Sequence, residues 1–313
     1  MELRQFRYFV TVVDSRSITR AAHHLHVVQS ALSHQIANLE KELGTILLLR
    51  GKHGVVPTEA GLLMYQYAQT VLKNVEAAKQ AISTAGQELR GSVQVAIPNS
   101  TAGVLALPLL QATRKTLPHV QLSLIEGLST SHAEGLAAGK FDLAILFDVG
   151  STGGFDATAL CTERLHFLSA DPRAVRAYTG APAISLEEVG KWPLLLPPLS
   201  TGIRLLLDRA CARTNLSLQI VAELSGLPTI RGAVQAGLGS TIIMAVNAQA
   251  TPQKKQVVML PIKRPGLERR SSVVHLRHAS LTPAAAAVKA LILETTDELI
   301  KANRWPGAKS SVA

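Results

Sequence analysis

Four polar side chains lie close together in a stretch that begins at position 29. Gln29, Ser30, Ser33 and His34 fall at helical spacing, so a helix would present them together near its start. Amides and hydroxyls of this kind pair with base edges: Gln forms two hydrogen bonds with adenine, and Ser bonds either bases or phosphate. A merely solvated helix face would carry the same residue types, so the stretch alone leaves both possibilities open.

A second set of candidates follows in a turn rich in glycine and cations. Arg50, Lys52 and His53 stand beside Gly51 and Gly54, a composition typical of a tight hairpin. Arg and Lys bind phosphate, and a His side chain can enter a minor groove. The turn therefore predicts a wing that touches a nucleic-acid backbone next to the polar helix.

Short helices must hold these side chains in place. Apolar residues repeat at helical spacing from Leu3 onward, Ser17 is a typical helix N-cap, and Gly44 is a typical helix stop. Two helices joined by a tight connector, with the second presenting polar residues early, outline a helix-turn-helix. Thr58 is placed to cap the helix that follows the hairpin.

The clearest periodicity of the chain runs through residues 59–89. Apolar residues alternate there at spacings of four and three, the a/d pattern of a seam between helices. We expect one long helix that pairs with its copy in a second subunit; an amphipathic helix packed on its own domain is the alternative. The seam residues are Met64, Ala68, Val71, Val75, Ala78, Ile82, Ala85 and Leu89.

From Val93 onward, short apolar runs alternate with helical stretches. Such alternation predicts a parallel sheet covered by helices on both faces, and the length of the region favours two subdomains with a cleft between them. Pro306–Ala313 is expected to be a solvated tail. The expected boundaries are 1–58 for the helix-turn-helix and wing, 59–90 for the linker helix and 91–303 for the α/β domain, with subdomain I at 91–161 and 269–303 and subdomain II at 162–268.

Hydroxyl-rich segments precede several of the α/β-domain helices. Free N–H groups at a helix N-terminus attract anions, so these segments predict a site for a carboxylate or another anion, while a plain N-cap is the simpler alternative for each. Arg204 is a candidate carboxylate clamp or an ordinary surface residue. The candidate ligand-binding residues are Asn99, Ser100, Thr101, Ser129, Thr130, Ser200, Thr201 and Thr229.

Catalytic and metal-binding patterns do not occur. The sequence holds no GxSxG, HExxH or GxxxxGK[ST] motif. His23, His24 and His26 cannot all face one way on a helix, which argues against a metal site. Cys161 and Cys211 form no CxxC pair and are expected to be reduced thiols. We expect no enzymatic activity, no cofactor and no metal.

Composition sets the broad class. The chain has 313 residues, a formal net charge of +10 and an apolar fraction of 47%, which argue against disorder and favour an anionic partner. No apolar run approaches the roughly 18 residues of a membrane span. The charged residues Glu2 and Arg4 stand where a signal peptide would need apolar ones. A soluble, cytoplasmic protein without a membrane partner is expected.

The first sixty residues resemble the N-terminal signature of the LysR-type transcriptional regulators. Matching stretches include Ser17-Ile18-Thr19, Gln29-Ser30-Ala31-Leu32-Ser33 and Thr58-Glu59-Ala60-Gly61. Within the family, Arg50–Thr58 and Pro108–Ala112 resemble the nitrogen assimilation regulators. Three positions depart from the family pattern: Val28 replaces a Ser or Thr, His53 replaces a frequent Arg, and Pro57 replaces a common Leu.

The resemblance implies a winged helix-turn-helix, a long linker helix and a two-subdomain α/β domain similar to periplasmic binding proteins. It implies that Gln29, Ser30, Ser33 and His34 face the major groove, with Arg50, Lys52 and His53 on the wing. Implied partners are double-stranded operator DNA, further copies in a dimer or tetramer, RNA polymerase and a small anionic effector, with protein abundance as the alternative control. The competing class is a solute-binding protein with a fused helical oligomerisation module, which would lack salt-dependent DNA affinity.

Overall fold

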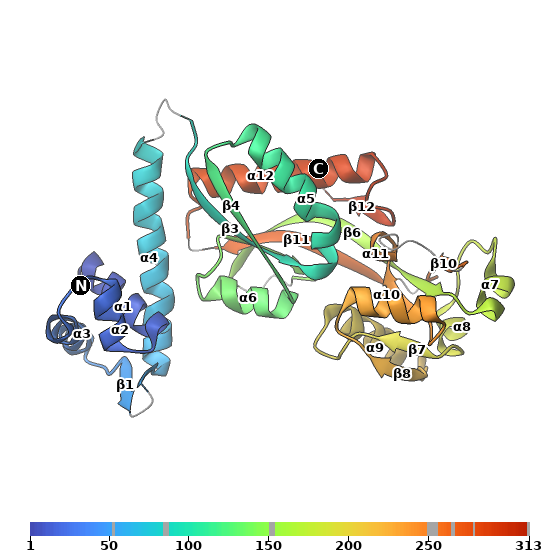
Figure 1. The fold of residues 1–313 in the computed structure, drawn as a ribbon, viewed down its shortest axis with the longest axis horizontal. Helices are drawn as coiled ribbons and strands as arrows, with labels where there is room; N and C mark the ends of the chain where they lie inside the picture. The colour runs from blue at the N-terminus through green and yellow to red at the C-terminus, as the bar shows by residue number, and fades with distance from the viewer. Residues whose placement is uncertain are drawn as a thin grey trace.

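The computed structural model has three parts in chain order (Figure 1). A helical domain with a two-stranded hairpin comes first, one long helix follows, and a mixed α/β domain completes the chain. This order confirms the expected fold class. The structure describes residues 1–51, 54–83, 88–149, 154–248, 256–263, 267–277 and 279–311.

The N-terminal domain is built around one small core. Phe9, Leu32 and Ile36 are fully buried there, because the apolar stripes of its helices face one another. Ser17 caps the second helix as predicted, since its side chain accepts a hydrogen bond from a backbone N–H. Gly44 ends the third helix at φ 66°, a left-handed conformation that suits glycine. The helices are α1 (Leu3–Ser15), α2 (Ile18–His24) and α3 (Gln29–Leu43).

The predicted hairpin forms the wing, from β1 (Leu48–Gly51) and β2 (Gly54–Pro57) paired antiparallel. Glu40 anchors it to α3, because its Oε1 accepts the N–H groups of Leu47 at 2.9 Å and Leu48 at 3.0 Å. This carboxylate fixes where the hairpin starts relative to the polar helix.

The long helix α4 is described over Glu59–Ser83. Thr58 caps it as expected, accepting the Gly61 N–H at 3.0 Å and donating to the Ile46 carbonyl at 2.8 Å. Gly61 has no room for a side chain, because a Cβ there would collide with the Leu47 carbonyl oxygen. The start of the helix is therefore locked to the wing.

The two ends of the predicted seam differ from expectation. Met64 packs against the core of the N-terminal domain, so the first turns of α4 follow the alternative of a helix packed on its own domain. Leu89 lies outside α4 and packs against the core of the α/β domain, and Ala85 falls outside the described residues. Among the described seam residues, the exposed ones lie near the C-terminal end of α4: Ala78 is exposed and Ile82 is 79% exposed, whereas Ala68 is fully buried.

Subdomain I is a sheet between helical layers. Helices α5 and α12 share the larger core on one face, and α6 covers the other face. Strand β3 pairs parallel with β4 and β5, and β11 pairs antiparallel with β5 and β6. The elements are β3 (Gly91–Pro98), α5 (Asn99–Thr116), β4 (Val120–Gly127), α6 (Ser129–Ala137), β5 (Leu143–Phe147), β6 (Phe155–Ser169), β11 (Glu268–Leu276) and α12 (Pro283–Lys301).

Subdomain II grows from the end of the same strand β6, whose last residues pair with β9 and β10. One continuous strand thus crosses from one subdomain to the other (Figure 1). The elements are α7 (Pro172–Tyr178), α8 (Leu186–Gly190), β7 (Leu194–Leu196), α9 (Gly202–Thr214), β8 (Ile220–Glu223), α10 (Leu227–Ala236), β9 (Thr241–Met244), α11 (Ala245–Ala248) and β10 (Val258–Pro261).

Two expectations for this domain were wrong. The sheet is mixed rather than parallel, because β6 and β11 run antiparallel through its middle. The segment Pro306–Ala313 is not simply a solvated tail, since β12 (Ala308–Ser310) pairs with β6 at Cys161–Glu163. Trp305, just before β12, is 1% exposed and holds this segment against the core.

Candidate functional site

The start of α3 presents its polar residues to solvent. Gln29, Ser30 and His34 are exposed and Ser33 is half-buried, while the opposite side of the helix enters the core. Val28, at the N-cap, is 70% exposed and makes no side-chain cap, so no side chain shields the first N–H groups. An open helix start of this kind attracts an anion such as a phosphate.

Hydrogen bonds fix three of these side chains before any ligand binds. Arg50 Nη1 donates to Ser33 Oγ at 2.9 Å and thereby ties the wing to α3. Thr19 Oγ1 donates to Gln29 Oε1 at 3.2 Å, and Asn38 Nδ2 lies 3.3 Å from His34 Nδ1. The predicted residues of α3 and Arg50 thus belong to one surface, whereas Lys52 and His53 lie outside the described residues.

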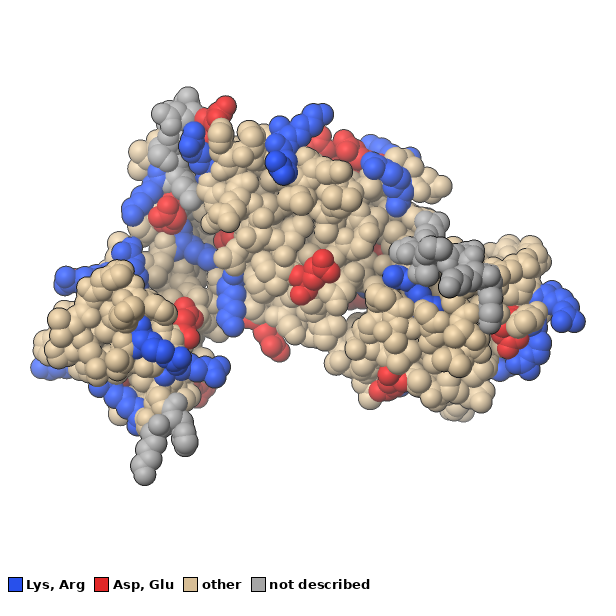
Figure 2. Space-filling model, viewed as in Figure 1, with Lys and Arg blue, Asp and Glu red and all other residues tan. Residues whose placement is uncertain are grey.

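Basic side chains flank this surface. On the face seen in Figure 2, several Lys and Arg side chains project from the N-terminal domain. Arg16 and Arg20 are both exposed and line a shallow depression at the end of α1 and along α2. Such cations supply the sequence-independent share of affinity for a phosphate backbone.

A second site lies between the subdomains of the α/β domain. It is a cleft of about 500 Å³ whose walls come from both halves. Six of the eight predicted ligand residues line it: Asn99, Ser100, Ser129, Thr130, Ser200 and Thr201. Thr101 is fully buried beneath the first turn of α5 and Thr229 is exposed outside the cleft, so the structure places both of these apart from it.

The helices that begin at this cleft share an unusual feature: none has a side-chain cap. The N-cap residues of α5, α6, α9 and α10 are Pro98, Leu128, Thr201 and Gly226, and none accepts a hydrogen bond through its side chain. Helices α7, α8 and α12, which begin elsewhere, are capped by Asp171, Ser185 and Thr282. The open N–H groups and helix dipoles at the cleft favour a negative charge.

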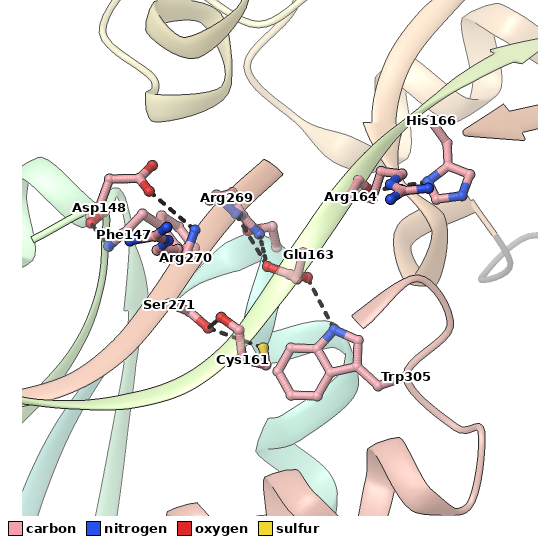
Figure 3. Close-up of polar contacts among 12 residues, drawn as sticks. Phe147, Asp148, Cys161, Glu163, Arg164, His166, Arg269, Arg270, Ser271 and Trp305 are labelled. Carbon is pink, nitrogen blue, oxygen red and sulfur yellow. Dashed lines mark hydrogen bonds and ion pairs between the residues drawn. The ribbon is translucent and has the colours of Figure 1, made fainter. Parts of the chain in front are cut away.

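Arg269 lines the cleft and was missed by the sequence analysis. Figure 3 shows its polar contacts with Glu163. It is 2% exposed, and its Nη2 donates to Glu163 Oε2 at 2.6 Å. Its Nη1 donates to Ser100 Oγ at 3.1 Å, and its guanidinium carbon lies 3.5 Å from the centre of the Phe147 ring. No sequence signal marks this residue, because an isolated Arg in a strand is normally a surface residue.

Arg204 is not the free carboxylate clamp that the sequence left open. It is 7% exposed and bonded within the protein, through Nε to Asp208 at 3.0 Å and through Nη1 to Glu223 at 2.7 Å. Asp208 belongs to the same helix as Arg204, and the contact with Glu223 fastens α9 to β8. The alternative of an ordinary surface residue is also wrong.

The two cysteines are buried thiols. Burial, with the nearby Glu163 carboxylate, raises the pKa of Cys161 to about 12. Burial also raises the pKa of Cys211. A thiol reacts as its thiolate, so neither side chain is poised for redox or nucleophilic chemistry.

Within the described residues, no group of three or more His, Cys, Asp and Glu side chains is arranged to hold a metal ion. In the same part of the chain, no helix has the length and apolar character needed to cross a bilayer.

Comparisons with known proteins agree with this geometry. Residues 3–62 match the model of the bacterial regulatory helix-turn-helix proteins of the LysR family, and residues 86–297 match the LysR substrate binding domain. The chain belongs to the LysR family. It is therefore a DNA-binding transcriptional regulator, and the competing class of a solute-binding protein with an oligomerisation module is set aside.

The similarity to individual relatives covers nearly the whole chain. The nitrogen assimilation regulatory protein of Klebsiella aerogenes is 34% identical over 97% of this chain and 98% of its own length. The corresponding Escherichia coli protein is 30% identical over 97% and 99%. The fold resembles a full-length OxyR variant from Pseudomonas aeruginosa, with a TM-score of 0.76, 24% identity and coverage of 95% and 94%.

Proposed function

We propose that the start of α3 reads an operator half-site in the major groove. Gln29, Ser30, Ser33 and His34 bond base edges or phosphates there, and Arg50 contacts the backbone from the wing. Lys52 and His53, which follow Arg50 and Gly51 in the sequence, extend the same contact in this proposal. The observation that carries this proposal is the Arg50–Ser33 hydrogen bond, because it joins wing and helix into one surface at 2.9 Å.

The protein works as a dimer or tetramer through α4. Two-fold pairing of the exposed part of this helix would set the spacing of two operator half-sites. Residues 1–58 then form the DNA-binding part, 59–90 the linker and 91–303 the regulatory part, and the bound assembly contacts RNA polymerase. Its site of action is the cytoplasm, and its output is control of transcription rather than catalysis.

The cleft of the regulatory part binds a small anionic effector. Asn99, Ser100, Ser129, Thr130, Ser200 and Thr201 supply hydroxyl, amide and helix N-terminal groups for it, and binding biases the angle between subdomains. Control by protein abundance alone is the alternative. Nitrogen metabolism is the proposed pathway, because two relatives at 34% and 30% identity are named nitrogen assimilation regulatory proteins.

Genome-wide mapping of bound DNA, followed by affinity measurements on the recovered operator, tests the proposal. Gln29→Ala and Ser33→Ala should each reduce the preference for that operator over unrelated DNA, since a good base contact contributes about 1–3 kcal/mol of discrimination. Lys41→Gln is the matched control, because Lys41 is exposed in the last turn of the same helix. Unchanged sequence preference in both Ala variants would refute the residue assignment.

A salt titration tests the binding mode itself. Each phosphate contact contributes a slope of about −0.9 to the dependence of log affinity on log salt. The wild-type protein should show a steep negative slope, and Arg50→Gln should show a shallower one. Affinity that is independent of salt would contradict the proposed function.

A further inference from the structure

Arg269 joins the cleft to the interior of subdomain I (Figure 3). On the cleft side its Nη1 donates to Ser100 Oγ, which lines the cleft in the first turn of α5. On the interior side, Nε at 3.2 Å and Nη2 at 2.6 Å both donate to the same oxygen of Glu163. The remaining N–H groups of the guanidinium have no acceptor among the described residues and are available to a ligand.

Glu163 carries the connection to the C-terminal segment. Its second oxygen, Oε1, accepts the indole N–H of Trp305 at 3.0 Å. Trp305 is fully enclosed in the core, and β12, which follows it, pairs with the strand that bears Glu163. A change at Arg269 therefore reaches Trp305 through one carboxylate.

The side chains that line the cleft carry more positive than negative charge: Arg269 and Arg209 against Asp148, with Glu163, the partner of Arg269, outside the lining. Asp148 is the acidic side chain among the described lining residues, and its Oδ1 already accepts the Arg270 N–H at 3.1 Å. Arg209, an exposed residue of α9, adds a second cation at the wall. The four uncapped helix starts add partial positive charge.

The rest of the cleft is apolar. Most of the side chains from α9, α10 and β9 that line it are aliphatic: Ile203, Leu205, Leu206, Leu227, Ile230, Ile242 and Ile243. Such walls favour an apolar body over a sugar or a polyphosphate, because polar groups buried there would lack partners.

We propose that Arg269 is the residue that recognises the effector's charge, that the effector is a small monocarboxylate with an apolar body, and that Glu163 transmits its arrival to Trp305. This inference rests on the proposed effector-binding function of the cleft.

Competition for one guanidinium is the physical basis. A carboxylate in the cleft accepts hydrogen bonds from the free N–H groups of Arg269. This contact draws the guanidinium away from Glu163 and toward Ser100. Glu163 then depends more on the Trp305 indole for its hydrogen bonding, because a buried carboxylate must keep its donors. The electrostatic surroundings of the indole change with occupancy.

Tryptophan fluorescence provides the readout in the full-length chain. The sequence has two tryptophans, so Trp192→Phe leaves Trp305 as the single reporter. The probes are monocarboxylates from acetate to 3-phenylpropanoate, each beside its neutral amide. We expect a saturable emission shift with carboxylates only, at lower concentration as the apolar body grows. No carboxylate response beyond that of the amides would overturn the proposal.

Variants assign the response to Arg269. Ser100→Ala should weaken carboxylate binding several-fold, and the paired Glu163→Gln/Arg269→Gln variant, which leaves no buried charge unpaired, should abolish it; binding to both variants is measured by calorimetry, because the paired variant lacks the Glu163 link to Trp305. Arg164→Gln is the matched control, because Arg164 neighbours Glu163 on β6 but pairs with Glu268 on the other face of the sheet. A paired variant that binds carboxylates as well as wild type would refute the role of Arg269.

The outcome is separable from that of the proposed function. Operator binding by α3 is measured without any carboxylate. An intact operator complex with no carboxylate response refutes this inference alone, whereas loss of operator recognition in the unmodified chain refutes the proposed function.

Discussion

Arg269 and Glu163 stand directly opposite each other on β11 and β6. The next pair along the strands, Glu268 and Arg164, repeats the same charge pairing on the other face of the sheet, because successive residues of a strand point to opposite sides. The Arg269–Glu163 pair is buried beside the cleft, with side chains 3% and 2% exposed, and the Arg164–Glu268 pair is 40% exposed on both partners.

Removing one partner of the buried pair should cost far more than removing both. Arg269→Gln leaves Glu163 buried without its cation and should lower the free energy of unfolding by about 3–5 kcal/mol. The paired Glu163→Gln/Arg269→Gln variant should recover much of that loss. Urea unfolding of the two variants measures the difference. Equal losses in both would show that the pair is not coupled.

Disruption of the exposed Arg164–Glu268 ion pair is the comparison. Arg164→Gln should change the free energy of unfolding by no more than about 1 kcal/mol, since water screens a surface ion pair. A loss of unfolding free energy as large as that of Arg269→Gln would show that burial does not determine how much an ion pair contributes.

His132 should make the protein less stable in mild acid. It is 3% exposed on α6, and neither ring nitrogen has a hydrogen-bond partner, so burial lowers its pKa below the usual 6.5. The unfolded chain binds a proton at pH values where the folded chain does not, so stability falls as pH drops below about 6.5. His132→Leu should flatten this part of the stability profile, whereas His24→Gln, at an exposed position, should not. Identical profiles in wild type and His132→Leu would contradict the prediction.

Gly61 should tolerate no side chain. Gly61→Ala forces a Cβ against the Leu47 carbonyl and should separate the wing from α4, lowering thermal stability and operator affinity together. Gly232→Ala is the control, because nothing lies within 4 Å of a Cβ there and it falls inside helix α10. The control should gain about 0.5–1 kcal/mol from helix propensity. A stable Gly61→Ala protein would show that the junction adapts.

Lys73 should couple the linker helix to the regulatory domain. Its Nζ lies 3.1 Å from Asp142 Oδ1 and donates to the Phe141 carbonyl at 3.1 Å. Both residues lie in the connection between α6, the helix that begins at the cleft, and β5. Lys73→Met should weaken the effect of an effector on operator binding while leaving effector affinity unchanged. Lys79→Met, at an exposed position of α4, is the control. If the effector changes operator binding by Lys73→Met as much as by the wild type, the Lys73 contact does not couple the two parts.

Cys161 should resist alkylation until the protein unfolds. With a pKa of about 12, only about one thiol in ten thousand is ionised at pH 8. Mass spectrometry after iodoacetamide treatment in buffer and in urea measures the contrast. Rapid modification of Cys161 in the folded protein would contradict its burial.

Local signals in the sequence determined the N-terminal part of the molecule. Ser17, Gly44 and Thr58 act at the element ends that their residue types predict, because a cap depends on a few neighbouring backbone groups. The hydroxyl-rich helix starts also predicted most of the polar residues that line the cleft, although Thr101 and Thr229 lie outside it. A helix start predicts a free N–H, but the direction in which each side chain points depends on packing.

Tertiary structure alone decided the parts that depend on distant residues. The partners Glu163 and Arg269 are 106 positions apart, so the sequence around either residue does not predict a buried ion pair. Pairing between strands that are distant in the sequence likewise made the sheet mixed and placed β12 beside β6. Strand pairing is a contact between segments brought together by folding, and the burial that gives Arg269 its chemistry exists only after those segments meet.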